Sequence, residues 1–242
     1  IPCLLVRGNG LVKTKKFRNP AYLGDPVNAI RIFSEKEVDE LIILDIDATV
    51  EKRDPNYDLI AEMAGEAFMP VAYGGGIHSL SQIRRLIRTG IEKVVINTAA
   101  TKSSNIITEA ANIFGSQAVV VAVDIKKSLF GRYKIVSHSG TQEIEANLDE
   151  YIQLVVESGA GEIFLNNVDR DGMMEGYDLA LIKKVSQSMN IPIIASGGAG
   201  KIQDMSLAIS EGGASAAAAG SLFVFYGKQK GVLMNYPTNV KI

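Results

Sequence analysis

The sequence predicts an α/β protein, and within that class a (β/α)8 barrel built from two similar half-barrels. Short β-branched runs alternate with amphipathic segments along all 242 residues. The apolar runs are continuous, which is typical of parallel strands buried on both faces of a sheet. A repeat at half-chain spacing favours closure of that sheet over the alternative, a doubly wound open sheet. Tyr57-Asp58-Leu59 recurs as Tyr177-Asp178-Leu179, and Gly75-Gly76 recurs as Gly197-Gly198, at offsets of 120 and 122 residues.

The elements follow one another without a linker. The expected strands, in chain order, are Ile1–Val6, Glu40–Asp45, Met69–Ala72, Lys93–Ile96, Ala118–Asp124, Glu162–Leu165, Ile191–Ala195 and Ala214–Ala218. Helical spacing of apolar residues lies between them, as in Leu80–Thr89, Ser104–Phe114, Leu148–Ser158, Leu179–Met189 and Ile202–Glu211. The longest irregular stretches, Arg7–Pro26 and Lys126–Ile144, follow strands one and five, where we expect mobile loops that close over a ligand. We expect one domain over residues 1–242, with half-barrels of roughly 1–116 and 117–242.

Composition narrows the class of protein. An apolar fraction of 47% is enough for a large core, and a net charge of −2 gives no basic excess that would attract nucleic acid or an anionic membrane. One cysteine allows no disulfide within the chain and fits the reducing cytoplasm. We expect no membrane span or signal peptide, and a few residues before Ile1, where an expected strand begins without Met. With two histidines and one cysteine, we also expect no metal and no cofactor.

Glycine-rich turns follow strands in both halves. The first half offers Gly76, Asn97 and Thr98, and the second offers Asp171, Gly172, Gly198, Gly220 and Ser221. Backbone N–H groups exposed at such turns can bind a phosphate dianion without a lysine. Tight turns alone would also need glycine, but the pairing at half-chain spacing favours a ligand with a phosphate at each end. Asp171 is expected to act through its loop geometry, because its carboxylate would repel phosphate.

One carboxylate stands out as an acid–base candidate. Asp124 ends the fifth expected strand, where its side chain would point into the barrel mouth. The half-barrel offset leads back to Leu5, so an apolar residue occupies the place where symmetry would allow a second carboxylate. That substitution matters because cyclisation and ring opening commonly use an acid and a base on opposite faces of the substrate.

The chain resembles the cyclase subunit of imidazole glycerol phosphate synthase, the HisF family, over nearly its whole length. The stretches that carry the resemblance are "IPCL", "GDPV", "DELIILDI", "VEKR", "GGGIH", "KVVINTAA", "FGSQAVVVAVD", "GAGEI", "DRDG" and "IPIIASGGAGK". The resemblance implies a barrel that receives ammonia through its core from a separate glutaminase subunit. The ammonia then attacks a ribulosyl aminoimidazole ribonucleotide that carries a phosphate at each end.

The resemblance also assigns roles to residues. The second catalytic aspartate of the family matches Asp124, whereas the first falls on Leu5, which cannot transfer a proton. A lysine that contacts phosphate and substrate matches Lys13, and Asn166 replaces a threonine near the end of strand six. The family's ring of charges that gates ammonia is matched by Glu40, Lys93 and Glu162, and its arginine lies before Ile1. Without the resemblance, these three charges would be interpreted as a solvated rim.

Three interpretations of function remain open. Degenerate relatives of the family share the leucine and the "NYP" tail of this chain, and they occur with a glutaminase and a sugar amidotransferase in surface-polysaccharide pathways. The favoured interpretation is therefore a subunit that delivers ammonia and binds a phosphorylated ligand for amidination of a sugar. The alternative is a working cyclase of histidine biosynthesis, which would make the chain a lyase. A phosphosugar-binding scaffold without an ammonia role is the third.

Overall fold

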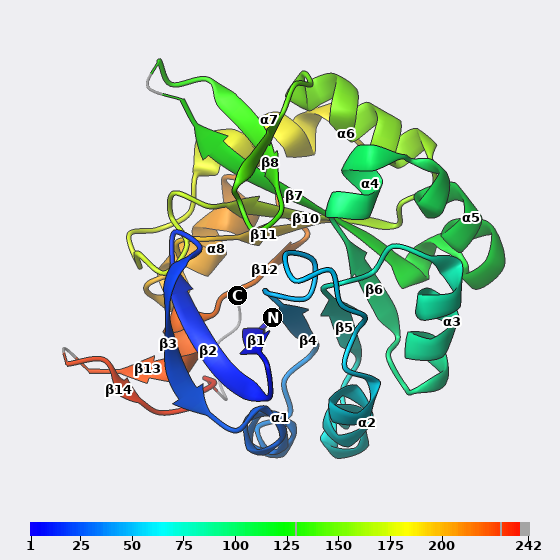
Figure 1. The fold of residues 1–242 in the computed structure, drawn as a ribbon. Helices are drawn as coiled ribbons and strands as arrows, with labels where there is room; N and C mark the ends of the chain where they lie inside the picture. The colour runs from blue at the N-terminus through cyan, green and yellow to red at the C-terminus, as the bar shows by residue number, and fades with distance from the viewer. Residues whose placement is uncertain (129, 228, 238–242) are drawn as a thin grey trace.

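The computed structural model describes residues 1–128, 130–227 and 229–237 and confirms the predicted (β/α)8 barrel (Figure 1). Parallel strands follow one another around the barrel in the order β1, β4, β5, β6, β7, β10, β11 and β12. Their bounds are β1 Cys3–Arg7, β4 Leu41–Asp45, β5 Val71–Gly74, β6 Lys93–Ile96, β7 Val119–Lys127, β10 Glu162–Asn167, β11 Ile193–Ser196 and β12 Ala216–Ala217.

The sheet closes between its first and last strands. Pro2 forms a parallel bridge with Ala219, the Cys3 amide donates to the Ala219 carbonyl over 2.9 Å, and the Ala219 amide donates to the Ile1 carbonyl over 3.0 Å. The first strand thus begins two residues later than expected, although the chain from Ile1 still takes part in closure. A closed barrel leaves no unpaired edge among these eight strands.

Helices cover the outside of the barrel. They are α1 Pro26–Glu35, α2 Tyr57–Glu66, α3 Leu80–Arg88, α4 Thr98–Lys102, α5 Asn105–Phe114, α6 Leu148–Glu157, α7 Leu179–Ser188, α8 Ile202–Ser210 and α9 Ser221–Val224, with a 3-10 turn at Ser116–Ala118. Side-chain caps start most of the long ones, and at α3 Ser79 and Gln82 form a reciprocal capping box. Within the described residues, no helix is long and apolar enough to cross a membrane.

Two apolar clusters make the core. The larger one fills the layer between the helices and the outer face of the strands. The smaller one fills the barrel interior and is built from Cys3, Ile42, Ala72, Val95, Val120, Ala122, Phe164, Ile194 and Ala218. These apolar side chains fill the part of the interior that lies between the two ends of the barrel.

The two stretches that were expected to be irregular are β-hairpins. Strands β2 (Gly10–Lys15) and β3 (Arg18–Gly24) follow β1, and strands β8 (Tyr133–Ser137) and β9 (Gln142–Ile144) follow β7. The expectation of irregular loops was wrong. The Gly8-Asn9 turn that joins β1 to β2 carries a hairpin signal, whereas the turns of β2–β3 and β8–β9 carry neither Asn-Gly nor Asp-Gly. Lys16 and Phe17 adopt φ of 51° and 60°, and His138 and Ser139, at the half-barrel offset, adopt 49° and 54°.

The end of the chain departs from the helical pattern of the barrel. After the short α9, strands β13 (Phe225–Tyr226) and β14 (Gly231–Val232) form a separate hairpin. The chain then runs back over α9, where the Tyr236 ring packs on Phe223 at a centroid distance of 5.3 Å and its hydroxyl donates to Asp39 over 3.2 Å. An extended segment anchored by an aromatic pair thus stands where a final long helix would complete the shell.

Corresponding strand ends in the two halves share a close backbone approach. A Cβ on Gly75 would lie 2.4 Å from the Asp45 carbonyl oxygen, and a Cβ on Gly197 would lie 2.4 Å from the Asn167 carbonyl oxygen. Both glycines have positive φ, of 118° and 90°. Only glycine fits these positions, because a side chain would meet neighbouring backbone that cannot move aside. The division into two half-barrels remains a prediction, which this geometric pairing supports.

We predict that Gly75→Ala lowers the free energy of unfolding by at least about 2 kcal/mol, because it adds strain at positive φ to a backbone clash. Gly65→Ala is the matched control, since Gly65 lies in α2 with nothing within 4 Å of its Cβ position. That variant should gain about 0.5–1 kcal/mol from helix propensity. Urea unfolding measures both, and equal effects of the two substitutions would contradict the close approach.

Candidate functional site

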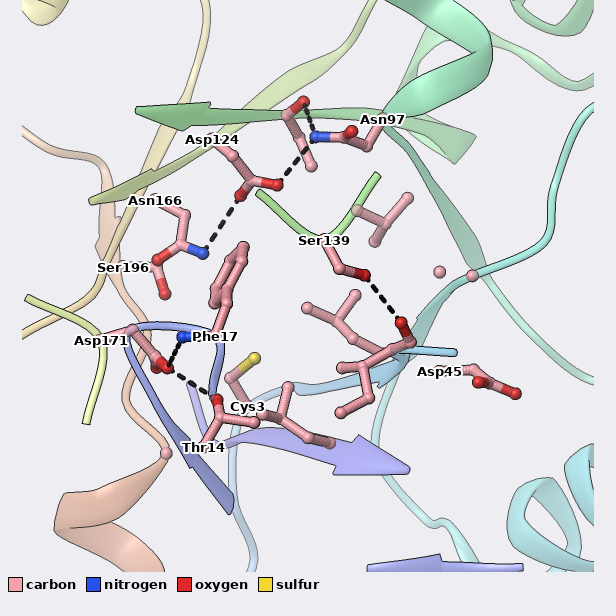
Figure 2. A pocket seen from close by; sticks show the side chains of 18 of the residues that line it. Cys3, Thr14, Phe17, Asp45, Asn97, Asp124, Ser139, Asn166, Asp171 and Ser196 are labelled. Atoms are coloured by element: carbon pink, nitrogen blue, oxygen red, sulfur yellow. Dashed lines mark hydrogen bonds between the residues drawn. The ribbon is translucent and has the colours of Figure 1, made fainter. Parts of the chain in front are cut away.

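A cavity of about 290 Å³ lies at the C-terminal ends of the barrel strands. Figure 2 shows side chains from β1, β4, β6, β7, β10 and β11 converging on it, together with Phe17 from the β2–β3 turn and Ser139 from the β8–β9 turn. The structure brings every predicted catalytic and binding residue into its lining: Lys13, Gly76, Asn97, Thr98, Asp124, Asn166, Asp171, Gly172, Gly198, Gly220 and Ser221. The floor of the cavity is the upper part of the apolar interior, including Cys3 and Phe164.

Asp124 lies in the wall of the cavity between two amides. Its Oδ1 accepts from Asn166 Nδ2 over 3.2 Å, and its Oδ2 accepts from Asn97 Nδ2 over 3.1 Å (Figure 2). Burial disfavours the charge and raises the pKa of Asp124 to about 7, although the hydrogen bond from Asn166 opposes that rise. Nearby Asp171 raises the pKa further. A carboxyl with this pKa can take up and release a proton at neutral pH.

Leu5 lines the same cavity and is buried among its neighbours β2 and β4. Two other carboxylates, Asp45 and Asp169, lie at or just after the ends of β4 and β10. Asp45 is held by the Arg53 guanidinium at 2.8 Å and by the amides of its own turn, and Asp169 accepts from the Lys127 amide. Both carboxylates therefore organise loops.

Asp171 is a further carboxylate in the lining of the cavity, and it clasps the β2–β3 hairpin. Its Oδ1 lies 2.7 Å from Lys13 Nζ, and its Oδ2 accepts from Thr14 Oγ1 over 2.7 Å. The expectation that Asp171 acts only through loop geometry is thus incomplete, because its carboxylate holds the predicted phosphate ligand Lys13. The pair is largely shielded from water, with 7% and 14% of the two side chains exposed.

The clasp sits beside the second predicted phosphate cradle. A Cβ on Gly220 would lie 3.0 Å from Lys13 Cε, and a Cβ on Gly172 would lie 2.3 Å from the Thr14 carbonyl oxygen. Ser221 Oγ is buried in this cradle and has no hydrogen-bond partner within the described part of the chain. A buried unpaired hydroxyl on a cavity wall can donate a hydrogen bond to an oxygen of a bound ligand.

The first predicted cradle is covered by the other hairpin. The Gly76 amide donates to Thr49 Oγ1 over 3.2 Å, and the His138 amide donates to Thr98 Oγ1 over 3.2 Å. Ser139 Oγ donates to the Ile46 carbonyl over 2.7 Å (Figure 2). Each hairpin therefore lies over the cradle of the opposite half. Sequence analysis missed Thr49, which has no charge and no neighbouring glycine, whereas Ser139 lies in the stretch Lys126–Ile144 that was expected to close over a ligand.

The hairpins also meet above the cavity. A Cβ on Gly140 would lie 3.1 Å from Phe17 Cδ2, and Lys126 Nζ donates to the Gly140 carbonyl. Phe17 itself points into the cavity, and its amide faces Asp171 Oδ2 at 3.5 Å (Figure 2). Contacts between the two turns thus narrow the mouth of the cavity, which remains open to solvent.

The three charged residues predicted to gate ammonia meet at the opposite, N-terminal end of the barrel. Lys93 Nζ lies 3.0 Å and 3.1 Å from the two Glu40 carboxylate oxygens and 2.9 Å from Glu162 Oε1. Burial opposes the charge on Lys93, but the hydrogen bonds to Glu162 and Glu40 outweigh it and raise the pKa of Lys93. The apolar interior separates this cluster from the cavity.

The chain is similar to known proteins over nearly its whole length. A family model described as "Histidine biosynthesis protein" matches residues 1–230. A Pseudomonas aeruginosa protein named "Putative imidazole glycerol phosphate synthase subunit hisF2" is 51% identical over 237 residues, which cover 98% of this chain and 94% of that protein. A Leptospira interrogans protein named "Putative imidazole glycerol phosphate synthase subunit HisF" is 47% identical, with coverage of 98% and 94%. An Alkaliphilus metalliredigens "Imidazole glycerol phosphate synthase subunit HisF" is 43% identical, with coverage of 92% and 88%.

We predict that Asp171→Asn loosens the β2–β3 hairpin, because it leaves the shielded Lys13 ammonium without a counter-charge. The cost should be about 2–3 kcal/mol, at the low end for a buried pair because the cavity admits water. Hydrogen exchange should speed up in β2 and β3, and Lys13→Met combined with Asp171→Asn should recover part of the loss. Glu66→Gln, which breaks the exposed Arg31–Glu66 pair, is the control and should cost under about 1 kcal/mol. Unchanged exchange in the hairpin would contradict the clasp.

A second prediction concerns pH. The pKa of Asp124 is raised from 3.8 to about 7 on folding, so between these values the unfolded chain releases a proton that the folded protein keeps. Asp124 therefore lowers stability progressively as the pH rises to about 7, and the full penalty remains above it. Asp124→Asn removes this titration. The stability of the variant relative to wild type should rise by about 2–3 kcal/mol between pH 5 and pH 8, measured by urea unfolding. A difference independent of pH would show that Asp124 is ionised throughout.

Proposed function

Because the chain belongs to the histidine biosynthesis protein family and, within it, to the HisF-type synthase subunits, we propose that it receives ammonia from a glutaminase partner. We also propose that it binds a ligand with a phosphate at each end. We propose further that the ammonia serves amidination of a sugar in surface-polysaccharide biosynthesis, together with a sugar amidotransferase. The reducing cytoplasm is the expected compartment.

One observation carries the proposal: Leu5 lines the same cavity as the residues that we predict to bind phosphate. The two cradles, Lys13 and Asp124 all line this cavity. An apolar side chain at the end of β1 leaves one side of a bound substrate without a group that can transfer a proton. Binding is therefore retained while half of the acid–base pair is absent, which favours a role in delivery over cyclisation.

The charge cluster at the other end supports the ammonia route. Lys93, Glu40 and Glu162 form a partly buried ionic patch at the N-terminal strand ends, and the cluster of side chains that fills the interior above it is apolar. Neutral ammonia is compatible with such an interior, whereas ammonium would lose its hydration there. The glutaminase is therefore placed, in this proposal, against the N-terminal end.

The alternative function is a genuine imidazole glycerol phosphate synthase cyclase, and one observation favours it. With a pKa near 7, Asp124 could act in turn as base and as acid. Ammonia would then react with the ribulosyl aminoimidazole ribonucleotide to give imidazole glycerol phosphate and an aminoimidazole carboxamide ribonucleotide. Residue 5 would take no part in the proton transfers.

The deciding experiment supplies purified protein with the ribulosyl aminoimidazole ribonucleotide and excess ammonium at pH 8.5. We expect binding of this ligand by calorimetry but no turnover by absorbance, because Leu5 transfers no proton. Leu5→Asp should restore at most a trace of turnover, since the cavity must also readjust to a second carboxylate. Wild-type turnover that is abolished by Asp124→Asn would establish the cyclase instead. Absence of binding by folded protein would refute the phosphate cradles.

A further inference from the structure

The two amides that hold Asp124 differ in their freedom to turn. Asn97 uses both hydrogens of its amide nitrogen, which donates to the Ala122 carbonyl over 3.0 Å and to Asp124 Oδ2 over 3.1 Å. Its oxygen faces Thr98 Oγ1 at 3.4 Å. Turning this amide would bring its oxygen against the Ala122 carbonyl, so Asn97 is locked as a donor toward Asp124.

Asn166 has no such lock. Its Nδ2 donates to Asp124 Oδ1 over 3.2 Å, whereas its Oδ1 is buried and has no hydrogen-bond partner among the described residues. The side chain is 5% exposed, so water does not readily satisfy that oxygen. An unpaired buried acceptor on the cavity wall is costly unless another state of the site uses it.

The surroundings of Asn166 permit a half-turn of its amide. The residue beside it on β11 is Ser196, whose hydroxyl can both donate and accept and can therefore follow either orientation. Figure 2 shows the two side chains next to each other at the cavity edge. On the same side, a Cβ on Gly197 would lie 3.0 Å from Asn166 Oδ1, so the glycine leaves the amide its space.

We infer that Asn166 is a positioning residue that supports both protonation states of Asp124 by turning its side-chain amide. When Asp124 is ionised, Asn166 Nδ2 donates to the carboxylate. When Asp124 is protonated, the turned amide presents Oδ1, which accepts the new O–H. Because Leu5 stands where the second carboxylate of an acid–base pair would lie, Asp124 exchanges protons without that carboxylate. A partner such as Asn166, which can bind both the ionised and the protonated form of Asp124, is therefore more important.

Several charged and titratable groups act on Asp124 beside the two amides. Asp171 of the β10–α7 connection disfavours its ionised form, and Lys126 of β7 favours that form. Asp124 in turn influences Cys3 on β1 and Tyr151 on α6. Lys13, on β2, is compensated by its contact with Asp171. Among the described residues, the side chains that donate a hydrogen bond to the Asp124 carboxylate are those of Asn97 and Asn166, and neither Cys3 nor Tyr151 does so.

The test reads the carboxyl group and the amide directly by NMR, in protein with labelled aspartate and asparagine side chains. In wild type, the side-chain amide resonances of Asn166 should titrate with the same midpoint as the Asp124 carboxyl carbon. Those of Asn97 should shift much less, because its hydrogen bonds persist. Asp124→Asn should abolish the titration of Asn166.

A pair of substitutions separates positioning from packing. Asn166→Leu keeps the volume but removes donor and acceptor, and it should raise the pKa of Asp124 by about one to two units, because the charge-assisted bond to the ionised form is the stronger one. Asn166→Thr retains a hydroxyl that donates and accepts, and it should hold the pKa within about half a unit of wild type. Threonine also keeps the test available if leucine prevents folding.

Two results would overturn the inference: Asn166 resonances that ignore the midpoint of Asp124, or an Asp124 pKa that is the same in wild type and in a folded Asn166→Leu. The inference rests on Asp124 as the acid–base group of the proposed function. Its test needs neither acceptor nor glutaminase, so a failure of ammonia delivery would leave the titration intact. If the titration failed, ligand binding could still be tested independently by calorimetry.

Discussion

The geometry of the mouth depends on closure of the sheet between β1 and β12. The backbone hydrogen bonds of Cys3 and Ala219 bring the beginning of the chain against the last strand of the barrel. This closure sets Leu5 and Lys13 beside Gly220 and Ser221, which are more than two hundred residues away in sequence. Because parallel strands all end at one face, closing the sheet also turns separate strand ends into one cavity.

Charge in that cavity is arranged in compensated units. Lys13 and Asp171 neutralise each other, Asp45 is matched by Arg53, and Asp124 is surrounded by amides rather than by a cation in direct contact. Under the proposed phosphate binding, a dianionic group in the second cradle would compete with Asp171 for Lys13. Ligand binding and release of the β2–β3 hairpin would then be linked, since the same ammonium would serve both.

Much of the fold could be predicted because its signals are local. Continuous apolar runs located the strands, and helical spacing located α3, α5, α6, α7 and α8 to within a residue or two of their observed bounds. The strand-end glycines likewise marked the residues that line the cavity. The sequence signals the β1–β2 turn through Gly8-Asn9, but it gives no such signal for the turns at Lys16-Phe17 and His138-Ser139, which adopt positive φ without glycine. The pairing of Asp171 with Lys13 was missed because the two residues lie 158 positions apart and meet only when the barrel has closed.

The crossed hairpins have a consequence for how the two halves relate. The hairpin after β1 reaches Asp171 and Gly172 in the second half, and the hairpin after β7 reaches Thr98 and Ile46 in the first. Each half of the chain therefore contains one predicted phosphate cradle and one hairpin, and that hairpin covers the cradle of the other half. Each cover is therefore in place only when the N-terminal and C-terminal parts of the chain have folded against each other.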